Sequence, residues 1–413
     1  MFNELMIPQR TIMTPGPVEA HPVVLQAMTR RILGQFDPAF LMIMDEVKEM
    51  IKLPFGTTNK EAFAIDGTSR AGLEAALIAL IEPGDRVLIP AYGRFAYLLG
   101  EICERAHAEV RYLEKEWVAP FAPETVIAEI ETFRPKIVAM VHGETANGQM
   151  QPLAEIGTYC RIHDLYFVVD MVATYGGVPL AIDEWCVDIA IAGTQKCLSV
   201  PSGLALVTYN DRVQEVLDAR YQKELGLSKT DRNKRHIVSN YLDLSQLQRY
   251  WNDERINHHT EATTMIYALH EGLRILLQEG LSNVYQRHAI NESALLAGIE
   301  AMGLTIYGAA ETKMPTVTPV FIPEGIDGEV IREELLCSFG VEIASSFGDL
   351  KGKIWRIGNM GYSSRKENIL HVLAALEGAL LYHQAPIHPG QAVPAALTLY
   401  QEKNIDLSTY AQE

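Results

Sequence analysis

Long apolar runs are absent from this sequence. Residues 75–81 are typical of the longest apolar stretches, whereas a membrane-spanning helix needs roughly 18 residues. Polar residues and a proline interrupt the first ten positions, where a secretory signal would carry an unbroken apolar core. We therefore expect no membrane partner and no export.

Basic residues are scarce relative to acidic ones. Lys and Arg number 35 against 52 Asp and Glu, which gives a formal net charge of −17. Such a balance repels nucleic-acid phosphates and anionic lipid, so we expect neither as a partner. The 48% apolar content in 413 residues excludes a disordered chain and allows a large core.

Cysteine is also rare. The five cysteines are an odd number and none shows C-x-x-C spacing: Cys103, Cys160, Cys186, Cys197 and Cys337. This pattern predicts buried free thiols in a reducing compartment, and hence a cytoplasmic protein.

Short β-branched runs alternate with helical stretches between about residues 60 and 210. The predicted strands are 62–65, 86–89, 109–113, 136–141, 166–169, 187–192 and 204–208. The predicted helices are 69–81, 94–106, 123–133 and 153–163. This alternation predicts an α/β fold with a mostly parallel sheet covered on both faces. Ligands of such sheets bind at the carboxyl ends of the strands.

The pattern changes beyond residue 210. Residues 219–243 are polar and carry Lys229, Arg232, Lys234 and Arg235, as in a solvated loop. A helix over 261–279 could link two domains. It is followed by predicted helices at 284–302 and 329–339, strands at 305–307, 317–322 and 353–357, and a last helix. We therefore predict an N-terminal arm (1–13), a large domain (14–279), a smaller C-terminal α/β domain (280–385) and a surface tail without assigned role (386–413).

A lysine and an aspartate follow two predicted strands. Asp170 ends the strand 166–169, and Lys196 follows the strand 187–192 within Gly193-Thr194-Gln195-Lys196. Such a pair suits pyridoxal phosphate, because the amine forms a Schiff base with the aldehyde and the carboxylate keeps the ring nitrogen protonated.

A possible anion site lies at Gly67-Thr68-Ser69, between a predicted strand and a predicted helix. Small residues at a helix start let backbone N–H groups face an anion, although Thr or Ser there is commonly only a helix cap.

Six segments carry a resemblance to a known family. They are Thr14-Pro15-Gly16-Pro17, Asp66-Gly67-Thr68-Ser69-Arg70, His142-Gly143-Glu144-Thr145, Val169-Asp170-Met171-Val172-Ala173, Gly193-Thr194-Gln195-Lys196 and Trp355-Arg356-Ile357-Gly358. In this order, over about residues 10 to 385, the chain resembles the alanine/serine–glyoxylate aminotransferases, which are class V, fold type I enzymes that use pyridoxal phosphate. The resemblance implies a seven-stranded sheet and a homodimer.

The resemblance also implies roles for individual residues. Lys196 would hold the cofactor, Asp170 would pair with its ring nitrogen, and Val172 and Phe95 would cover the two ring faces. Arg356 would clamp the substrate carboxylate. The remaining implied cofactor contacts are Thr68, Ser69, Gln195, Thr145, which also approaches the substrate, and Thr260, which would reach the phosphate of the second subunit.

Two departures from the family pattern concern the substrate. The chain has Gln35 after Gly34 where many relatives have His, and Asn257 where many have Tyr. A side-chain amide offers donors and an acceptor together, which complements a ureido group. The combination resembles the (S)-ureidoglycine–glyoxylate aminotransferases of purine (allantoin) breakdown, which pass an amino group from ureidoglycine to glyoxylate or another small 2-oxo acid. The alternative interpretation is that Gln35 and Asn257 arose by neutral drift at the rim of the pocket and do not select the substrate.

Other conspicuous residues have structural interpretations. His258, His259 and His270 are not expected to bind metal, because no carboxylate or Cys completes ligand spacing. Cys197 and Cys337 are expected to pack in the core, and Asp37 before Pro38 is either functional or a turn former. Alternative functions are an alanine– or serine–glyoxylate aminotransferase, a desulfurase-like lyase and a binding protein without activity.

Overall fold

A seven-stranded sheet forms the centre of the larger part of the molecule. The computed structural model describes residues 2–224, 226–227 and 232–403, so Lys229 of the predicted polar loop lies outside the described residues. The strand order is β2 (Glu61–Asp66), β10 (Leu204–Tyr209), β9 (Ile189–Gly193), β8 (Tyr166–Asp170), β5 (Ile137–Val141), β3 (Arg86–Ala91) and β4 (Glu109–Glu114). Strand β10 runs antiparallel to both neighbours, and the other pairs are parallel.

The central strands are buried because they are apolar on both faces. Every residue of β5, β9 and β10 is buried, whereas the edge strand β4 alternates exposed and half-buried residues. Strands in which polar and apolar residues do not alternate must be covered on both faces of the sheet. The predicted fold class is therefore confirmed, and each predicted strand of the sheet agrees with the structure to within two residues at either end.

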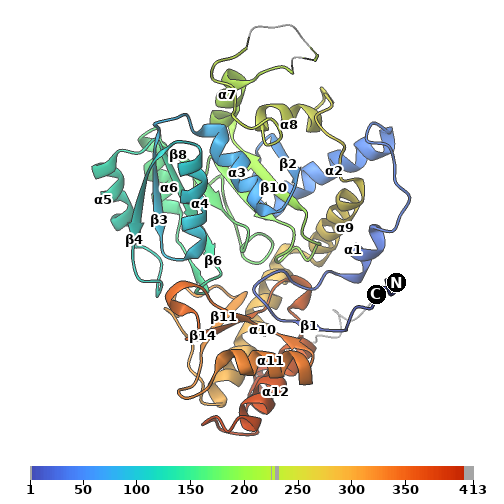
Figure 1. Cartoon of the computed structure of the whole chain (residues 1–413), viewed down its shortest axis with the longest axis vertical. Helices are drawn as coiled ribbons and strands as arrows, with labels where there is room; N and C mark the ends of the chain where they lie inside the picture. The colour runs from blue at the N-terminus through green and yellow to red at the C-terminus, as the bar shows by residue number, and fades with distance from the viewer. Residues whose placement is uncertain (1, 225, 228–231, 404–413) are drawn as a thin grey trace.

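Helices pack on this sheet as the alternation predicts (Figure 1). Helix α3 (Ser69–Leu80) packs against β8, β9 and β10, and α4 (Arg94–Arg105) packs beside it against β3, β4 and β5. Helices α5 (Pro123–Phe133) and α6 (Ala154–Ile162) contact β3 and β8 respectively. The polar loop lies between α7 (Asp211–Arg220) and α8 (Leu244–Trp251).

Two N-terminal helices escaped sequence analysis: α1 (Pro22–Ala27) and α2 (Pro38–Phe55). The signals for α2 are present, because the Asp37 carboxylate accepts a hydrogen bond from Ala39 N at 2.8 Å and Gly56 ends the helix with φ of +64°. Asp37 therefore caps a helix.

The second part of the molecule lies below the sheet in Figure 1 and has its own core. Helix α9 (Thr263–Glu279) leads into α10 (Leu281–Ala301), which packs against α12 (Lys366–Tyr382). A three-stranded antiparallel sheet has the order β11 (Val317–Phe321), β14 (Ile354–Gly358) and β13 (Ala344–Ser345), and α11 (Gly328–Ser338) follows β11 in the chain.

The strand predicted at 305–307 does not form. Only one isolated bridge, between Ile306 and Val320, joins this segment to β11. Gly303 and Gly308 flank the segment with φ of +83° and +90°, so the backbone bends on both sides before a ladder can extend.

The chain beyond residue 386 differs from the predicted surface tail. Helix α13 (Ala392–Glu402) packs against α10 with Ala392, Ala396 and Tyr400 buried. The Tyr400 hydroxyl donates to Asn291 Oδ1 at 2.6 Å inside this contact. The polar residues on either side of this mostly apolar helix led to the prediction of a tail, but its buried residues belong to the second core. Residues 404–413 lie outside the described range.

The N-terminal segment joins this second core as well. Strand β1 (Thr11–Ile12) pairs in parallel with β12 (Val341–Glu342), and Met13 is fully buried in the second core. The chain therefore crosses from the smaller core to the sheet within residues 13–22. None of the helices in the described ranges has the length and hydropathy to cross a membrane.

Candidate active site

A cavity of about 370 Å³ lies at the carboxyl ends of the central strands. Eight of the residues singled out in the sequence line it: Thr68, Ser69, Phe95, Thr145, Asp170, Val172, Gln195 and Lys196. These residues come from segments far apart in the chain, and the parallel arrangement of β5, β8 and β9 brings their carboxyl ends to one edge. The volume suits a small organic ligand.

Lys196 follows β9 and is 8% exposed. Its Nζ donates a hydrogen bond to the carbonyl oxygen of Pro15. Burial lowers the pKa of Lys196 to about 8, and the nearby positive charge of Arg356 acts in the same direction. A substantial fraction of the amine is therefore neutral, and nucleophilic, close to neutral pH.

Asp170 ends β8 and lies in the same cavity. Its Oδ1 accepts a hydrogen bond from Val172 N at 2.9 Å. Burial raises the pKa of Asp170 to about 6, although the Val172 hydrogen bond and the Lys196 charge oppose the rise. Among the described residues Asp170 forms no salt bridge, so the carboxylate can accept a cationic or protonated ligand atom.

The predicted anion site has the geometry of an open helix start. Helix α3 begins at Ser69, and Thr68 occupies the cap position without a side-chain hydrogen bond to the helix. Ser69 Oγ lies 3.0 Å from Gln195 Nε2, which joins the two loops. Gly67 has φ of +132°, which favours glycine there. Ala71 N donates to the Thr68 carbonyl at 2.8 Å, but within the described residues the Thr68 hydroxyl and the N–H groups of Ser69 and Arg70 are free to bind an anion.

The two predicted ring walls face the cavity from different segments. Phe95 lies in the first turn of α4, and Val172 lies in the loop after β8. The backbone N–H of Phe95 donates to Glu144 Oε2 at 2.8 Å, which anchors the start of α4.

Glu144 is a site residue to which sequence reasoning gave no role. It is fully buried, and its Oε1 accepts a hydrogen bond from Ala146 N at 2.8 Å. Burial raises the pKa of Glu144 to about 7. Its place in the His142-Gly143-Glu144-Thr145 segment was the available signal, and the motif alone did not distinguish a ligand contact from a support for α4.

Arg356 lies on β14 of the smaller core and reaches the cavity through Thr145. Its Nη1 donates to the Thr145 carbonyl at 2.9 Å, and its Nε donates to the Ser345 carbonyl at 2.7 Å. Burial lowers the pKa of Arg356 to about 10, and the Glu144 charge opposes this shift. The guanidinium therefore stays charged at neutral pH, with three further N–H donors for an anionic ligand.

The loop before α1 covers Lys196. Gly16 has φ of +107°, and a Cβ atom there would lie 2.5 Å from Lys196 Nζ. Only glycine allows the backbone to pass so close to the amine. The Thr14-Pro15-Gly16-Pro17 segment marked this loop in the sequence, but its contact with Lys196 needed the tertiary structure.

Besides Arg356, which contacts the lining residue Thr145, four predicted substrate or cofactor residues do not line the Lys196 cavity. Gly34, Asn257 and Thr260 are exposed, and Gln35 is half-buried. The structure does bring the two amides together, since Gln35 Nε2 donates to Asn257 Oδ1 at 2.8 Å. Gln35 Oε1 accepts from Glu261 N at 3.1 Å, which holds the pair against the loop before α9.

The prediction that the cysteines are buried is only partly confirmed. Cys103, Cys160 and Cys197 are buried, and burial raises the pKa of Cys197 to about 12. Cys186 is half-buried, and Cys337 is exposed, which corrects the prediction of a core position. Leu335 of α11 is buried and Leu336 is half-buried, whereas Cys337 lies on the exposed side of the helix.

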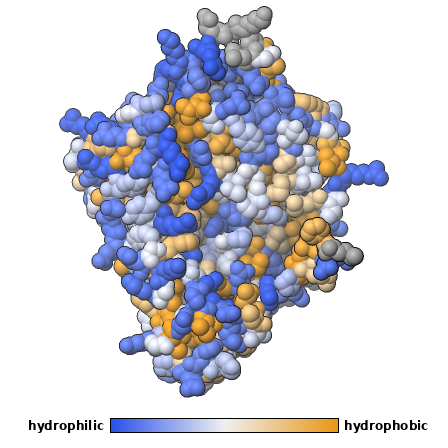
Figure 2. Space-filling model, viewed as in Figure 1, coloured by the Kyte–Doolittle hydropathy of each residue, from blue (hydrophilic) through white to orange (hydrophobic). Residues whose placement is uncertain are grey.

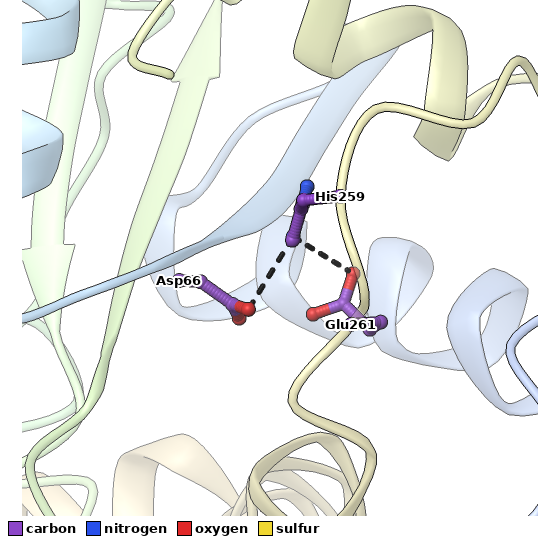
Figure 3. Close-up of side chains that lie close together, drawn as sticks. All are labelled: Asp66, His259 and Glu261. Carbon is purple, nitrogen blue, oxygen red and sulfur yellow. Dashed lines mark ion pairs between the residues drawn. The ribbon is translucent and has the colours of Figure 1, made fainter.

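The histidines have different surroundings. His270 contacts the exposed Glu46, but His259 lies beside the carboxylates of Asp66 and Glu261 (Figure 3). Sequence spacing could not show this group, because Asp66 comes from the end of β2.

Comparisons with known proteins agree with this geometry. A family model described as aminotransferase class-V matches residues 25–350. The (S)-ureidoglycine–glyoxylate transaminase of Bacillus subtilis is 58% identical over 97% of this chain and 97% of its own length. The alanine–glyoxylate aminotransferase of Drosophila melanogaster is 34% identical over 91% of this chain and 93% of its own. The crystal structure of ureidoglycine–glyoxylate aminotransferase from Bacillus subtilis has a TM-score of 0.92, covering 97% of this chain and 100% of that chain, with 58% identity.

Fold, cavity and relatives together define an aminotransferase of fold type I, the class that the sequence predicted. This chain belongs to the class-V aminotransferase family. Enzymes of this family depend on pyridoxal phosphate.

The raised pKa of Asp170 predicts a pH-dependent cost to the cofactor-free fold. Because the folded-state pKa of about 6 exceeds the ordinary 3.8, stability is lost as the pH rises from about 4 to about 6. We expect Asp170→Asn to raise the free energy of unfolding of the cofactor-free chain at pH 8 by up to about 3 kcal/mol. Urea denaturation between pH 4 and pH 8 measures this difference, which should shrink toward pH 4.

The exposed Asp253 provides the matched control, since Asp253→Asn should leave the pH profile unchanged. A constant difference between the Asp170→Asn variant and the parent at every pH would contradict the role of ionisation.

Proposed function

We propose that the cavity binds pyridoxal phosphate and that Lys196 holds it. The fit rests on three features of the chain: a buried lysine amine, a buried carboxylate without a salt bridge, and an open helix start at Thr68 and Ser69. Ser69, Thr68 and Gln195 would bind the phosphate, and Asp170 would pair with the ring nitrogen. Phe95 and Val172 would enclose the ring, with Thr145 beside its hydroxyl group.

Bound pyridoxal phosphate supplies an aldehyde that takes up an amino group and a ring that accepts electrons. The residues of the chain would transfer the proton and hold the substrate. Lys196 Nζ, with its pKa lowered to about 8 by burial, is suited to take a proton from the substrate carbon and return it. Arg356 would hold the substrate carboxylate, and Glu144 would keep Phe95 in place through its backbone N–H.

We infer that the amino donor is (S)-ureidoglycine and that the acceptor is glyoxylate or another small 2-oxo acid. Transfer of the amino group gives oxalurate from the donor and glycine from glyoxylate. The observation that carries this inference is the Gln35–Asn257 amide pair in a chain 58% identical to a transaminase named for that reaction. Asn257 Nδ2 and the second N–H of Gln35 Nε2 could donate to a ureido carbonyl.

An alanine–glyoxylate aminotransferase is the second candidate. It is favoured by the 34% identity to the Drosophila melanogaster enzyme of that name over most of both chains. The lower identity and the amide pair make it the weaker proposal. A desulfurase-like reaction lacks support, because the exposed Cys337 lies on α11 and is not among the residues that line the Lys196 cavity.

We propose that two copies of the chain form the active unit. Thr260, Asn257 and Gly34 are exposed and lie outside the Lys196 cavity, so they can serve a partner's site. The N-terminal arm exposes Phe2, Leu5, Met6 and Ile7, and the segment from α1 to α2 exposes Leu25, Ile32, Phe36, Met42 and Leu53. Figure 2 shows hydrophobic residues near the edge where Figure 1 places α1 and α2. Exposed apolar surface of this extent favours an interface.

A cytoplasmic location is consistent with the thiols. None of the cysteines in the structure forms a disulfide, and three of them are buried. We therefore propose a reducing compartment.

Replacement of the proposed cofactor lysine tests the reaction. We expect Lys196→Ala to lower kcat/KM on the order of 1,000-fold or more, because both the covalent anchor and the base are lost. Circular dichroism should show an unchanged fold. Lys351→Ala, at an exposed turn, is the control and should keep full activity, and full turnover by Lys196→Ala would refute the assignment.

The amide pair predicts substrate choice. Asn257→Tyr and Gln35→His should lower kcat/KM for ureidoglycine relative to alanine, since one unmatched polar group in a closed site costs ~1–3 kcal/mol, or roughly 5- to 150-fold. The measurement is the ratio of the two kcat/KM values in parent and variants. Gln26→His, at an exposed position on α1, should not change the ratio. Equal losses for both donors would mean that the amides only fill space.

The proposed interface can be tested with two isoleucines of equal exposure. Ile32 is 72% exposed near the proposed interface, and Ile162 is 73% exposed on α6. Sedimentation should show a dimer for the parent and for Ile162→Glu, but a shift toward monomer with loss of activity for Ile32→Glu. A fully active monomer at assay concentration would overturn the proposal.

A further inference from the structure

Three potential metal ligands converge beside the end of β2, outside the Lys196 cavity. His259 Nε2 lies 3.3 Å from Asp66 Oδ2 and 3.8 Å from Glu261 Oε2. Their side chains are 9%, 14% and 1% exposed respectively. Figure 3 shows the imidazole and both carboxylates directed at one point between the strand and the loop before α9.

The hydrogen bonds behind the group determine which nitrogen of His259 carries hydrogen. His258 Nε2 lies 3.3 Å from the Asn240 carbonyl oxygen, which can only accept, so this nitrogen donates. In the neutral ring, His258 Nδ1 is then an acceptor, and it lies 2.9 Å from His259 Nδ1. His259 Nδ1 must therefore donate, which leaves a lone pair on Nε2 of the neutral ring facing Asp66 and Glu261.

In their ionised forms, both carboxylates therefore present only acceptor atoms to the neutral imidazole and to each other. Within the part of the chain that the structure describes, no hydrogen-bond partner exists for Glu261 Oε1 and Oε2, His259 Nε2 or Asp66 Oδ1. Glu261 as a whole is only 4% exposed, so water does not compensate its charge freely. Burial and the neighbouring Asp66 carboxylate raise the pKa of Glu261 well above its usual range, so this group of acceptors takes up either a proton or a metal cation.

The spacing of the three groups matches that of ligands around one metal ion. Metal–ligand distances of about 2.0–2.2 Å place neighbouring ligand atoms ~3–4 Å apart. One ligand atom from each of Asp66, His259 and Glu261 lies within 4.8 Å of the others, and His259 Nε2 lies 3.3 and 3.8 Å from the two carboxylates. A hydrogen-bonded imidazolium would lie closer to at least one carboxylate.

We propose that Asp66, His259 and Glu261 bind one divalent first-row transition-metal cation of the Zn²⁺ or Mn²⁺ class. One imidazole nitrogen and two carboxylates suit these ions better than Mg²⁺ or Ca²⁺, which favour oxygen ligands alone. The donated Nδ1–H of His259 orients the ring, as the outer hydrogen bonds of metal-ligating histidines commonly do.

The site would join the loop before α9 to the end of β2. Glu261 N donates to Gln35 Oε1, and Gln35 donates to Asn257, so a cation that fixes Glu261 also fixes the amide pair. The importance of the fixed amide pair for the substrate rests on the proposed function, whereas the binding of the metal does not. The cation would be structural, since it lies outside the cavity that Lys196 lines.

Equilibrium dialysis of the tag-free holoenzyme against ZnCl₂ or MnCl₂, with elemental analysis of the bound metal, tests the site without any substrate. We expect one ion per chain in the parent and at least tenfold weaker binding by Glu261→Gln. The matched control is Glu46→Gln, because Glu46 pairs with Nε2 of His270 at 2.7 Å while Glu271 lies at the other ring nitrogen, so these two carboxylates do not converge on one nitrogen. This control should bind as the parent does.

A second measurement protects the test against a folding defect. Metal should raise the Tm of the parent and of Glu46→Gln, but not that of Glu261→Gln or Asp66→Asn. If Glu261→Gln does not fold, Asp66→Asn takes its place in the dialysis. Failure of the parent to bind either metal, or equal binding by the parent and the folded variant, would overturn the proposal. Neither result depends on which amino donor the enzyme uses.

Discussion

Burial of the Lys196 amine beside the Asp170 carboxylate is the constraint on which the site depends. Both groups lie at the carboxyl ends of adjacent parallel strands, β9 and β8, so their approach is set by the sheet register. The same burial shifts both pKa values toward neutrality, to about 8 for the amine and about 6 for the carboxyl group. An amine that is partly neutral and a carboxylate without a salt bridge are unfavourable for a bare fold, but they suit a site that receives an aldehyde and a protonated ring. The stability lost in the cofactor-free chain and the proposed chemistry thus have one physical origin.

The two cores depend on each other at this site. Arg356 belongs to β14 of the smaller core, and its guanidinium holds the backbone of Thr145, which lines the cavity of the larger one. The N-terminal segment crosses in the opposite direction, from β1 against β12 to the loop in which Gly16 covers Lys196. A displacement of the smaller core would therefore move Arg356 and the loop that covers Lys196 together.

Much of this arrangement was predictable because its signals are local. Apolar runs without polar alternation predicted the buried strands. The residues that follow these strands, such as Asp170 and Lys196, then indicated which edge of the sheet binds a ligand. The missed helices do carry local signals, but their surroundings obscured them. Helix α13 is a mostly apolar segment between polar ones, and α2 has its cap residues Asp37 and Gly56 but a proline near each end. The prediction for Cys337 failed because an apolar neighbourhood in sequence does not tell which side of a helix a residue occupies.

The sequence alone determined the fold class, through strand periodicity, and the aminotransferase family and eight residues that line the lysine cavity, through motifs that are contiguous in the chain and resemble that family. Tertiary structure alone decided what lies between segments that are distant in sequence. It paired Gln35 with Asn257, placed Glu144 behind Phe95, and brought Asp66 to His259 and Glu261. The physical reason is that hydrogen bonds and charge repulsion act over a few ångströms in space, whereas separation along the chain sets no such distance once the sheet has folded.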